Sequence, residues 1–277
     1  EKTVIKDYDG DKTAAVTGDG SKLVVKWSPV TGSYYTNGGT HTCDAVNIPA
    51  TANTPQRVNN GLTQFQILSG SDKTVTVKNV KFVYTPAAFK LCTNAVASEG
   101  QYHGSFEADD APAGQLYFMT TGDVTFESCD FDKVVLTTFN TTGTSTVTNC
   151  NFANVYNNYA IKDIRGANVS VTGTTITNCG GGIMVSSTDT VSKVTLTNNI
   201  FKDVDVAGTA PTNKVGTRAI LQFASSGDYA KATLDITSNK AENCGPALRQ
   251  LNEGSEIKTA IKSMEPSLTS QFGKTLY

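Results

Sequence analysis

Little charge, few histidines and no paired cysteine motif characterise this sequence. Asp, Glu, Lys and Arg make up only 17% of its 277 residues, and 23 Lys and Arg against 25 Asp and Glu leave a formal net charge of -2. The chain lacks the basic excess of duplex-binding proteins, so we expect no nucleic-acid partner. The six Cys form no CxxC pair and the two His lie apart from them, which argues against a zinc site.

Long apolar runs and recognisable targeting segments are missing as well. No stretch approaches the length needed to cross a bilayer, and no signal peptide is visible. The chain opens at Glu1 rather than Met, so we expect an upstream segment and a place within a longer surface protein. Thr, Ser, Asn and 24 Gly fill the composition instead, and they favour strands and tight turns over helices.

A short segment of mixed polar and apolar residues recurs along the chain. It reads VKNVKF, FESCDF, VTNCNF, VTGTTI, LTNNIF and ITSNKA, starting at residues 77, 126, 147, 171, 196 and 236. Steps of 21, 24 and 25 residues each correspond to one winding of a solenoid. The step of 49 fits two windings or one with a long insertion, and the step of 40 fits one winding with an insertion of about fifteen residues.

Aligning these segments produces columns of similar residues. The first residue of each segment, and the residues two before, five after and eight after it, are nearly all apolar. Because strand residues alternate faces, these columns predict a core built by stacking like on like. The polar column two residues after the first contains Asn79, Ser128, Asn149, Gly173, Asn198 and Ser238. We interpret it as a corner between strands with stacked amides sharing hydrogen bonds, in preference to an exposed row for sugars.

Four of the cysteines fall into the same alignment. Cys129 and Cys150 share the column three residues after the first, and Cys179 and Cys244 share an apolar column with valines. A buried Cys behaves as a small apolar residue, so we interpret all four as core. A bridge between Cys129 and Cys150, on adjacent windings, is the disulfide alternative.

The pattern predicts an all-β fold, a single-stranded parallel β-helix. We expect an N-terminal β cap over residues 1–70, the β-helix over 71–252 and a C-terminal cap over 253–277. In that last segment Ile257, Ile261, Met264 and Leu268 have the spacing of a short amphipathic helix. Leucine-rich repeats have a similar period, but the Leu columns and helical segments they need are missing here. DYDGDKTAAVTGDG lacks the closing Glu of a calcium loop and is interpreted as a turn.

The segments LTNNIF and VTNCNF resemble those of the pectin-lyase-like right-handed β-helix family over about residues 70–252. The resemblance implies a right-handed helix and a family that includes enzymes acting on acidic glycans, some with calcium held by carboxylates beside a basic residue. Polygalacturonase-like members carry an NTD triplet, a DD pair, a GHG and an RIK. Here DD at 109–110 follows YHG at 102–104, and NTD and RIK are missing, which argues against hydrolase activity.

The candidate site lies on the third strand of each winding. Insertions at about 94–115 and 205–218 border this strand, and insertions in repeat proteins cluster on the binding face. We predict ligand-binding roles for Tyr102, His103, Glu107, Lys90, Lys162 and Arg249. The catalytic candidates are Asp109, Asp110, Lys162 and Arg165, since paired carboxylates or a carboxylate beside a cation can cleave glycans. No metal site is predicted, and calcium is the one cofactor that the resemblance allows.

Three functions are compatible with these observations. We favour a secreted or cell-surface module, part of a bacterial surface protein, that binds a polysaccharide, a glycoprotein glycan or a host surface without catalysis. The second is a polysaccharide lyase or glycoside hydrolase acting on an acidic glycan. The third is a structural stalk, which would need no long insertions. The composition and the missing catalytic set favour the first, with an extracellular or cell-surface location.

Overall fold

The computed structural model describes residues 2–6, 13–17, 23–27, 41–42, 47–48, 64–68, 74–84, 89–90, 105–106, 114–120, 122–140, 142–155, 158–186, 191–206, 218–223, 232–249 and 262–273.

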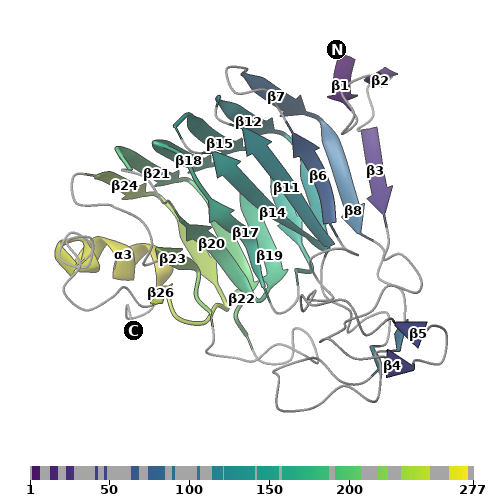
Figure 1. The fold of residues 1–277 in the computed structure, drawn as a ribbon. Helices are drawn as coiled ribbons and strands as arrows, with labels where there is room; N and C mark the ends of the chain where they lie inside the picture. Colours follow the sequence, from purple (N-terminus) through teal and green to yellow (C-terminus); the bar gives the residue numbers. More distant parts are fainter. Residues whose placement is uncertain are drawn as a thin grey trace.

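Three parallel sheets run along the chain, and successive windings add one strand to each (Figure 1). The first sheet contains β7 (Val75–Lys78), β12 (Val124–Glu127), β15 (Thr144–Thr148), β18 (Asn168–Thr172), β21 (Lys193–Thr197) and β24 (Thr233–Thr237). The second sheet contains β3 (Leu23–Trp27), β8 (Val80–Tyr84), β13 (Asp130–Asp132), β16 (Asn151–Ala153), β19 (Thr175–Cys179), β22 (Ile200–Val204) and β25 (Lys240–Glu242). The third sheet contains β6 (Gln64–Leu68), β11 (Gly114–Thr120), β14 (Val134–Asn140), β17 (Tyr159–Ile164), β20 (Gly181–Val185), β23 (Leu221–Phe223) and β26 (Leu248–Arg249). The parallel solenoid predicted from the sequence is confirmed, and β3 and β6 carry two of its sheets into residues 1–70.

Three pairs of described strands stand apart from these sheets. They are β1 (Lys2–Lys6) with β2 (Thr13–Thr17), β4 (His41–Thr42) with β5 (Asn47–Ile48), and β9 (Phe89–Lys90) with β10 (Ser105–Phe106), all antiparallel. The last pair corrects one expectation, because Phe89 and Lys90 do not belong to the third strand of a winding. That strand is β11, which follows the long insertion.

The strand register reproduces the repeat found in the sequence. Phe126 pairs with Val77 on one side and Val147 on the other, and the same column continues through Val171, Leu196 and Ile236. The steps of 49 and 40 residues are therefore single windings with insertions. In the second sheet Phe82, Phe131 and Phe152 stack with ring centroids 5.1 and 4.2 Å apart. Both columns are buried, so stacking like on like builds the core.

Left-handed backbone forms two corners in the winding. The predicted polar column has φ between 52° and 59° from Asn79 to Ser238, which confirms that it is a corner. A second left-handed column, which the sequence pattern did not predict, contains Lys133, Asn154, Asn178, Asp203 and Asn243. Here Asn178 Nδ2 donates to Asn154 Oδ1 at 2.8 Å, and Asn154 Nδ2 donates to Asp132 Oδ1 at 2.9 Å. Hydrogen-bonded amides therefore occur at the second corner, and at the first corner they lie one residue after the predicted column, where Asn199 Nδ2 donates to Asn239 Oδ1 at 3.0 Å.

A ladder of buried polar side chains follows the inner side of the first corner. Its members, three residues after the first core column, are Cys129, Cys150, Thr174, Asn199 and Asn239. Asn199 Nδ2 donates to the carbonyl of Val171 at 2.9 Å, and its Oδ1 accepts the backbone N–H of Thr174 at 3.0 Å. Asn239 repeats both bonds one winding later. The ladder satisfies buried backbone groups where the chain turns from one sheet to the next.

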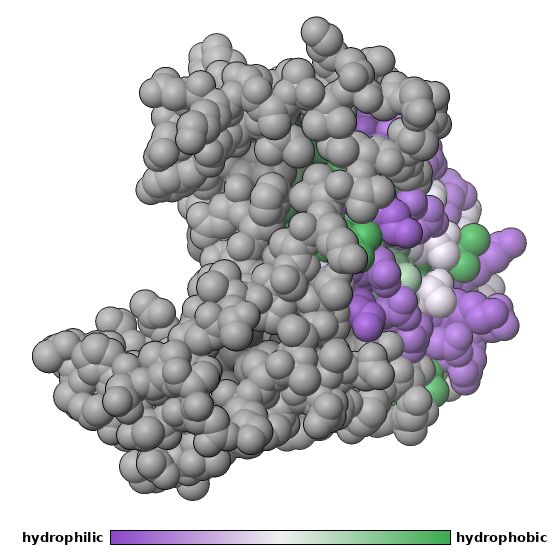
Figure 2. Space-filling view, turned by 90° about the vertical axis from the view of Figure 1, so that its right-hand side faces the viewer, coloured by the Kyte–Doolittle hydropathy of each residue, from purple (hydrophilic) through white to green (hydrophobic). Residues whose placement is uncertain are grey.

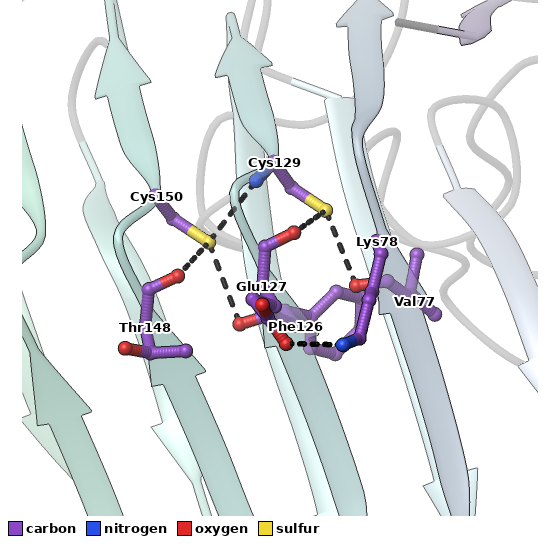
Figure 3. Close-up of polar contacts among 7 residues, drawn as sticks. All are labelled: Val77, Lys78, Phe126, Glu127, Cys129, Thr148 and Cys150. Carbon is purple, nitrogen blue, oxygen red and sulfur yellow. Dashed lines mark hydrogen bonds and ion pairs between the residues drawn. The ribbon is translucent and has the colours of Figure 1, made fainter. Parts of the chain in front are cut away.

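Cys129 and Cys150 form the N-terminal rungs of this ladder (Figure 3). The Sγ of Cys150 lies 3.6 Å from the Phe126 carbonyl and 3.4 Å from the backbone nitrogen of Cys129. Both residues, like Cys179 and Cys244, are buried and unbridged, which confirms their interpretation as core and not as a disulfide pair. Burial raises the pKa of the Cys179 thiol to about 12. Cys43 and Cys92 lie outside the described residues.

Helix α3 (Glu265–Phe272) packs against the last winding at the C-terminal end (Figure 1). Leu268 and Phe272 are buried, as the predicted capping helix requires, whereas Ile257 and Ile261 lie outside the described residues. Gln271 adds a final rung to the inner ladder: its Oε1 accepts the N–H of Asn239, and its Nε2 donates to the carbonyl of Ile236, both at 2.9 Å. The helix thus supplies the bonds that an Asn on a further winding would make. Among the described residues no helix is long and apolar enough to span a membrane.

The described surface on the side shown in Figure 2 is mainly hydrophilic, with small and separate apolar spots. Ile200, with 47% of its surface exposed, is the one large hydrophobic side chain that stands exposed among the described residues. A single exposed apolar side chain of this kind is normal on protein surfaces.

We predict that the inner ladder contributes strongly to stability. Asn199→Ala leaves the N–H of Thr174 and the carbonyl of Val171 without their buried partners, at a cost of about 1–3 kcal/mol for each group. The free energy of unfolding, measured by urea titration, should fall accordingly. Asn151→Ala is the control, because Asn151 is exposed and its side-chain amide donates to Asp130 Oδ1 at the surface, at 2.9 Å. Equal losses in the two variants would show that the ladder contributes no more than a surface bond.

Candidate functional site on the third sheet

A β-bulge interrupts the third sheet at β17. Its pairing with β14 shifts from Leu136–Ile161 to Thr138–Ile164, and its pairing with β20 shifts from Ile161–Ile183 to Ile164–Val185. Lys162 and Asp163 therefore stand together where each neighbouring strand has one residue. Asp163 takes up the extra length with a left-handed backbone, φ 54°. Such bulges redirect side chains, and they are over-represented beside active sites.

The bulge lies in the middle of a row of half-buried side chains on the outer face of the sheet. The residues on either side of it in sequence, Ile161 and Ile164, are fully buried in the core. Along the sheet the row continues with Met184 and Gln222, which pair with each other. Gln222 in turn pairs with Arg249, of which only the strand position is described. The row offers amide, thioether and cationic groups to a ligand lying across the strands.

Three ionisable side chains meet beside the bulge. Burial raises the pKa of the Tyr117 phenol, the nearby carboxylate of Asp163 raises this pKa further, and the guanidinium of Arg165 opposes the increase. Asp163 Oδ1 also accepts a hydrogen bond from Ser186 Oγ at 2.8 Å. Tyr117 therefore stays protonated at neutral pH, where it can donate a hydrogen bond but cannot act as a base.

Arg165 is held by its backbone at the end of β17. Its N–H donates to Thr138 Oγ1 at 3.2 Å, and its carbonyl accepts from Ser145 Oγ. Thr138 lies on β14 in the third sheet, one winding earlier, and Ser145 lies on β15 in the first sheet, in the same winding as β17. Two sheets therefore fix the position from which the guanidinium extends toward Tyr117.

Tyr159 contacts the residues at the C-terminal end of the row, toward Gln222. Its ring lies over Gly181, where an added Cβ would come within 2.6 Å of the ring carbon Cδ1. Its hydroxyl donates to Gln222 Oε1 at 2.5 Å, two windings along. A glycine at 181 is therefore needed for the tyrosine to reach across the intervening strand and orient the amide of Gln222.

A covered strip limits how much of this face is open. Four positions of the third sheet alternate with core residues and yet are at most 1% exposed. They are Val135, Ala160, Ile220 and Ala247. The neighbouring row is half-buried at Tyr117, the bulge, Met184 and Gln222, whereas Thr137, which stands between Tyr117 and the bulge, is only 2% exposed.

The predicted site residues are brought together only in part. Lys162 and Arg165 lie on the same outer face, and their roles stay a prediction. Lys90 does not, because β9 is outside the third sheet. Tyr102, His103, Glu107, Asp109 and Asp110 lie outside the described residues, so their convergence with the basic side chains stays a prediction.

Sequence reasoning missed Asp163, Tyr117 and Ser186. A signal for the bulge was present in YAIKDI, where Ile161 and Ile164 stand three residues apart although strand alternation places core residues two apart. Nothing in the sequence linked Tyr117 or Ser186 to that bulge, since Tyr117 lies two windings before β17 and Ser186 one winding after it. Across the described ranges no three His, Cys, Asp or Glu residues are grouped so that they could hold a metal ion.

Comparison with known proteins assigns the family. The model of the right-handed β-helix region matches residues 65–261, and the chain belongs to this family. It has the parallel β-helix architecture of pectin-lyase-like proteins. No curated protein and no solved structure matches the sequence.

The electrostatics of the site predict opposite effects of two substitutions on one phenol. Asp163→Asn removes the negative charge that disfavours the phenolate, so the pKa of Tyr117 should fall. Arg165→Gln removes the opposing positive charge, so the same pKa should rise. NMR titration of tyrosines labelled at Cζ, assigned with Tyr117→Phe, measures both shifts. Asp235→Asn on the first sheet is the control that should leave the titration unchanged, and shifts of the same sign in both site variants would refute the arrangement.

Proposed function

We propose that the protein is a non-catalytic β-helix module that binds an acidic glycan across the outer row of the third sheet. The observation that carries the proposal is the bulge at β17, which places Lys162 in the middle of a row with Met184 and Gln222 on a rigid face. Strands about 4.8 Å apart place successive side chains at short, regular intervals along a linear polymer that crosses them. We place the module outside the cell or at the cell surface, where such polymers are found.

The charges of the described site favour an anionic ligand. Lys162 and Arg165 supply two cations, whereas the one carboxylate that the described residues bring beside them, Asp163, accepts a bond from Ser186. Arginine and lysine make strong charge-assisted hydrogen bonds with carboxylates and sulfates. The protonated Tyr117 and the amide of Gln222 are suited to sugar hydroxyls. A polysaccharide or a glycoprotein glycan carrying uronic acids or sulfate fits this set.

The same groups argue for binding rather than cleavage. Glycoside hydrolysis needs two carboxyl groups facing the bond to be broken, and Asp163 is one. Burial and the carboxylate of Asp163 raise the pKa of Tyr117, which disfavours this phenol as the base of an elimination reaction. The lyase or hydrolase alternative would need Asp109 and Asp110 beside Lys162 and Arg165, with or without calcium.

Affinity electrophoresis tests the proposal. The protein should be retarded by gels containing an acidic polysaccharide and not by gels containing a neutral one. The double variant Lys162→Ala/Arg165→Ala should bind about tenfold more weakly or worse, since each lost charge-assisted bond is worth about 1.5–3 kcal/mol. The double variant Lys202→Ala/Lys240→Ala, on exposed positions of the second sheet, removes the same charge and should keep its affinity.

Product assays with and without calcium complete the experiment. New reducing ends or absorbance from unsaturated uronates, lost in Asp109→Ala/Asp110→Ala, would replace the proposal with the enzyme alternative. Equal weakening in the two lysine-containing double variants would mean attraction by net charge alone. No retardation by any polysaccharide would leave the stalk as the better explanation.

A further inference from the structure

The outer face of the first sheet carries two rows of hydroxyl groups. The side chains that alternate with its core column form one row of Thr76, Thr125, Thr146, Ser170, Thr195 and Asp235, and a second row of Lys78, Glu127, Thr148, Thr172, Thr197 and Thr237. Every position carries a hydroxyl except Lys78, Glu127 and Asp235. We call these two rows the hydroxyl face.

The hydroxyl face is regular and firmly anchored. The five pairings of this sheet run in unbroken register from β7 to β24, in contrast to the bulged third sheet. The residues between the two rows, such as Val147, Val171 and Leu196, are at most 1% exposed. Thr172 Oγ1 donates to Thr148 Oγ1 at 3.1 Å, so neighbouring rungs point their hydroxyls along the same row. The face is therefore a fixed lattice rather than a set of independent side chains.

Within the two rows charge is confined to the ends, whereas the adjacent outward row of Thr144, Asn168, Lys193 and Thr233 carries the exposed Lys193 on β21. Lys78 Nζ lies 2.8 Å from Glu127 Oε2, as Figure 3 shows for the N-terminal end. At the other end Asp235 Oδ1 accepts a bond from Thr237 Oγ1 at 3.0 Å. The strands between them, β15, β18 and β21, contribute only Thr and Ser to the two rows.

Strand propensity alone does not explain this distribution. The corresponding outer rows of the second sheet contain Lys81, Asp130, Asn151, Thr175, Ile200 and Lys240, and Val83, Asp132, Ala153, Thr177, Lys202 and Glu242. Those strands are as regular, yet they carry mixed charges and have Thr only at β19. If Thr were chosen only because it suits a pleated surface, it would occur on both sheets.

We propose that the hydroxyl face binds ice. Parallel strands repeat about every 4.8 Å. Water molecules hydrogen bonded tetrahedrally at about 2.8 Å place second-neighbour oxygens about 4.5 Å apart, so each row nearly matches a repeat of the ice lattice. A threonine offers a hydroxyl that joins that lattice and a methyl group that fills the space between its oxygens. At β15, β18 and β21 the two rows hold no ion whose own hydration shell would compete with this order.

The residues of the face favour ice over a crystalline polysaccharide. Sugar rings are held in proteins by stacking on aromatic side chains and by directed polar groups. The two rows contain no aromatic residue. A site that binds through lattice match alone needs only identical small groups at equal intervals, which is what the central strands provide.

Partition into a slowly growing ice front, together with inhibition of ice recrystallisation, tests the proposal. The wild-type protein should be enriched in the ice and should arrest crystal coarsening. Thr172→Lys puts a charge at the centre of the face and should weaken both effects about tenfold or more, because the charge must lose its water at the ice surface. Thr177→Lys is the matched control on the second sheet, where lysines already occur, and should retain both effects. Urea titration of both variants verifies that each is folded.

Three results would overturn the inference. They are exclusion of the wild-type protein from ice, equal losses in Thr172→Lys and Thr177→Lys, and binding to microcrystalline cellulose or chitin that Thr172→Lys abolishes while ice binding is absent. The variant Lys162→Ala/Arg165→Ala, altered on the third sheet, should bind ice as the wild type does. Glycan binding and ice binding can therefore fail separately.

Discussion

The buried hydrogen bonds at the inner side of the first corner hold the windings in register, and the rest of the structure depends on that register. Each Asn of the ladder accepts a backbone N–H and donates to a backbone carbonyl of the preceding winding. A slip by one residue would break these bonds and turn a core column outward. Gln271 of α3 makes the same pair of bonds, so the ladder also determines where the solenoid ends.

A constant register in two sheets allows the third to depart from it. The extra residue at Lys162 and Asp163 changes the pairing of β17 with both neighbours, while β15, β16, β18 and β19 around it keep theirs. The strain of the left-handed Asp163 is then local, and the altered direction of two side chains produces a site. Tyr117, Arg165 and Ser186 gather at this place because the neighbouring windings are fixed. The chemistry of the third sheet is thus concentrated where the repeat is interrupted.

The outer positions of the three sheets are free of the constraint that makes the core uniform. Residues that face inward must stack like on like, and they vary only among apolar and small residues. Outward residues do not have to match, so their composition reports what each face contacts. The first sheet carries two rows that are hydroxylated at their centre, with Lys193 in a neighbouring row, the second carries mixed charges, and the third combines cations with a phenol and an amide. One scaffold therefore presents three surfaces of different chemistry.

Much of the scaffold could be predicted from the sequence because a solenoid repeats its constraints. The period, the core columns, the corner from Asn79 to Ser238 and the buried cysteines all appear as recurring residue types, and recurrence is visible without coordinates. From the sequence, the site could be predicted only as a sheet that carries Lys162 and Arg165. Its other residues occur once and do not recur from one winding to the next. Ser186 reaches Asp163 from the next winding, Gln271 reaches Asn239 across 32 residues, and β9 pairs with β10 outside the solenoid. The sequence by itself determined the repeating unit, whereas only the tertiary structure decided where that unit is interrupted and what meets there, because those contacts join residues that no periodic pattern relates.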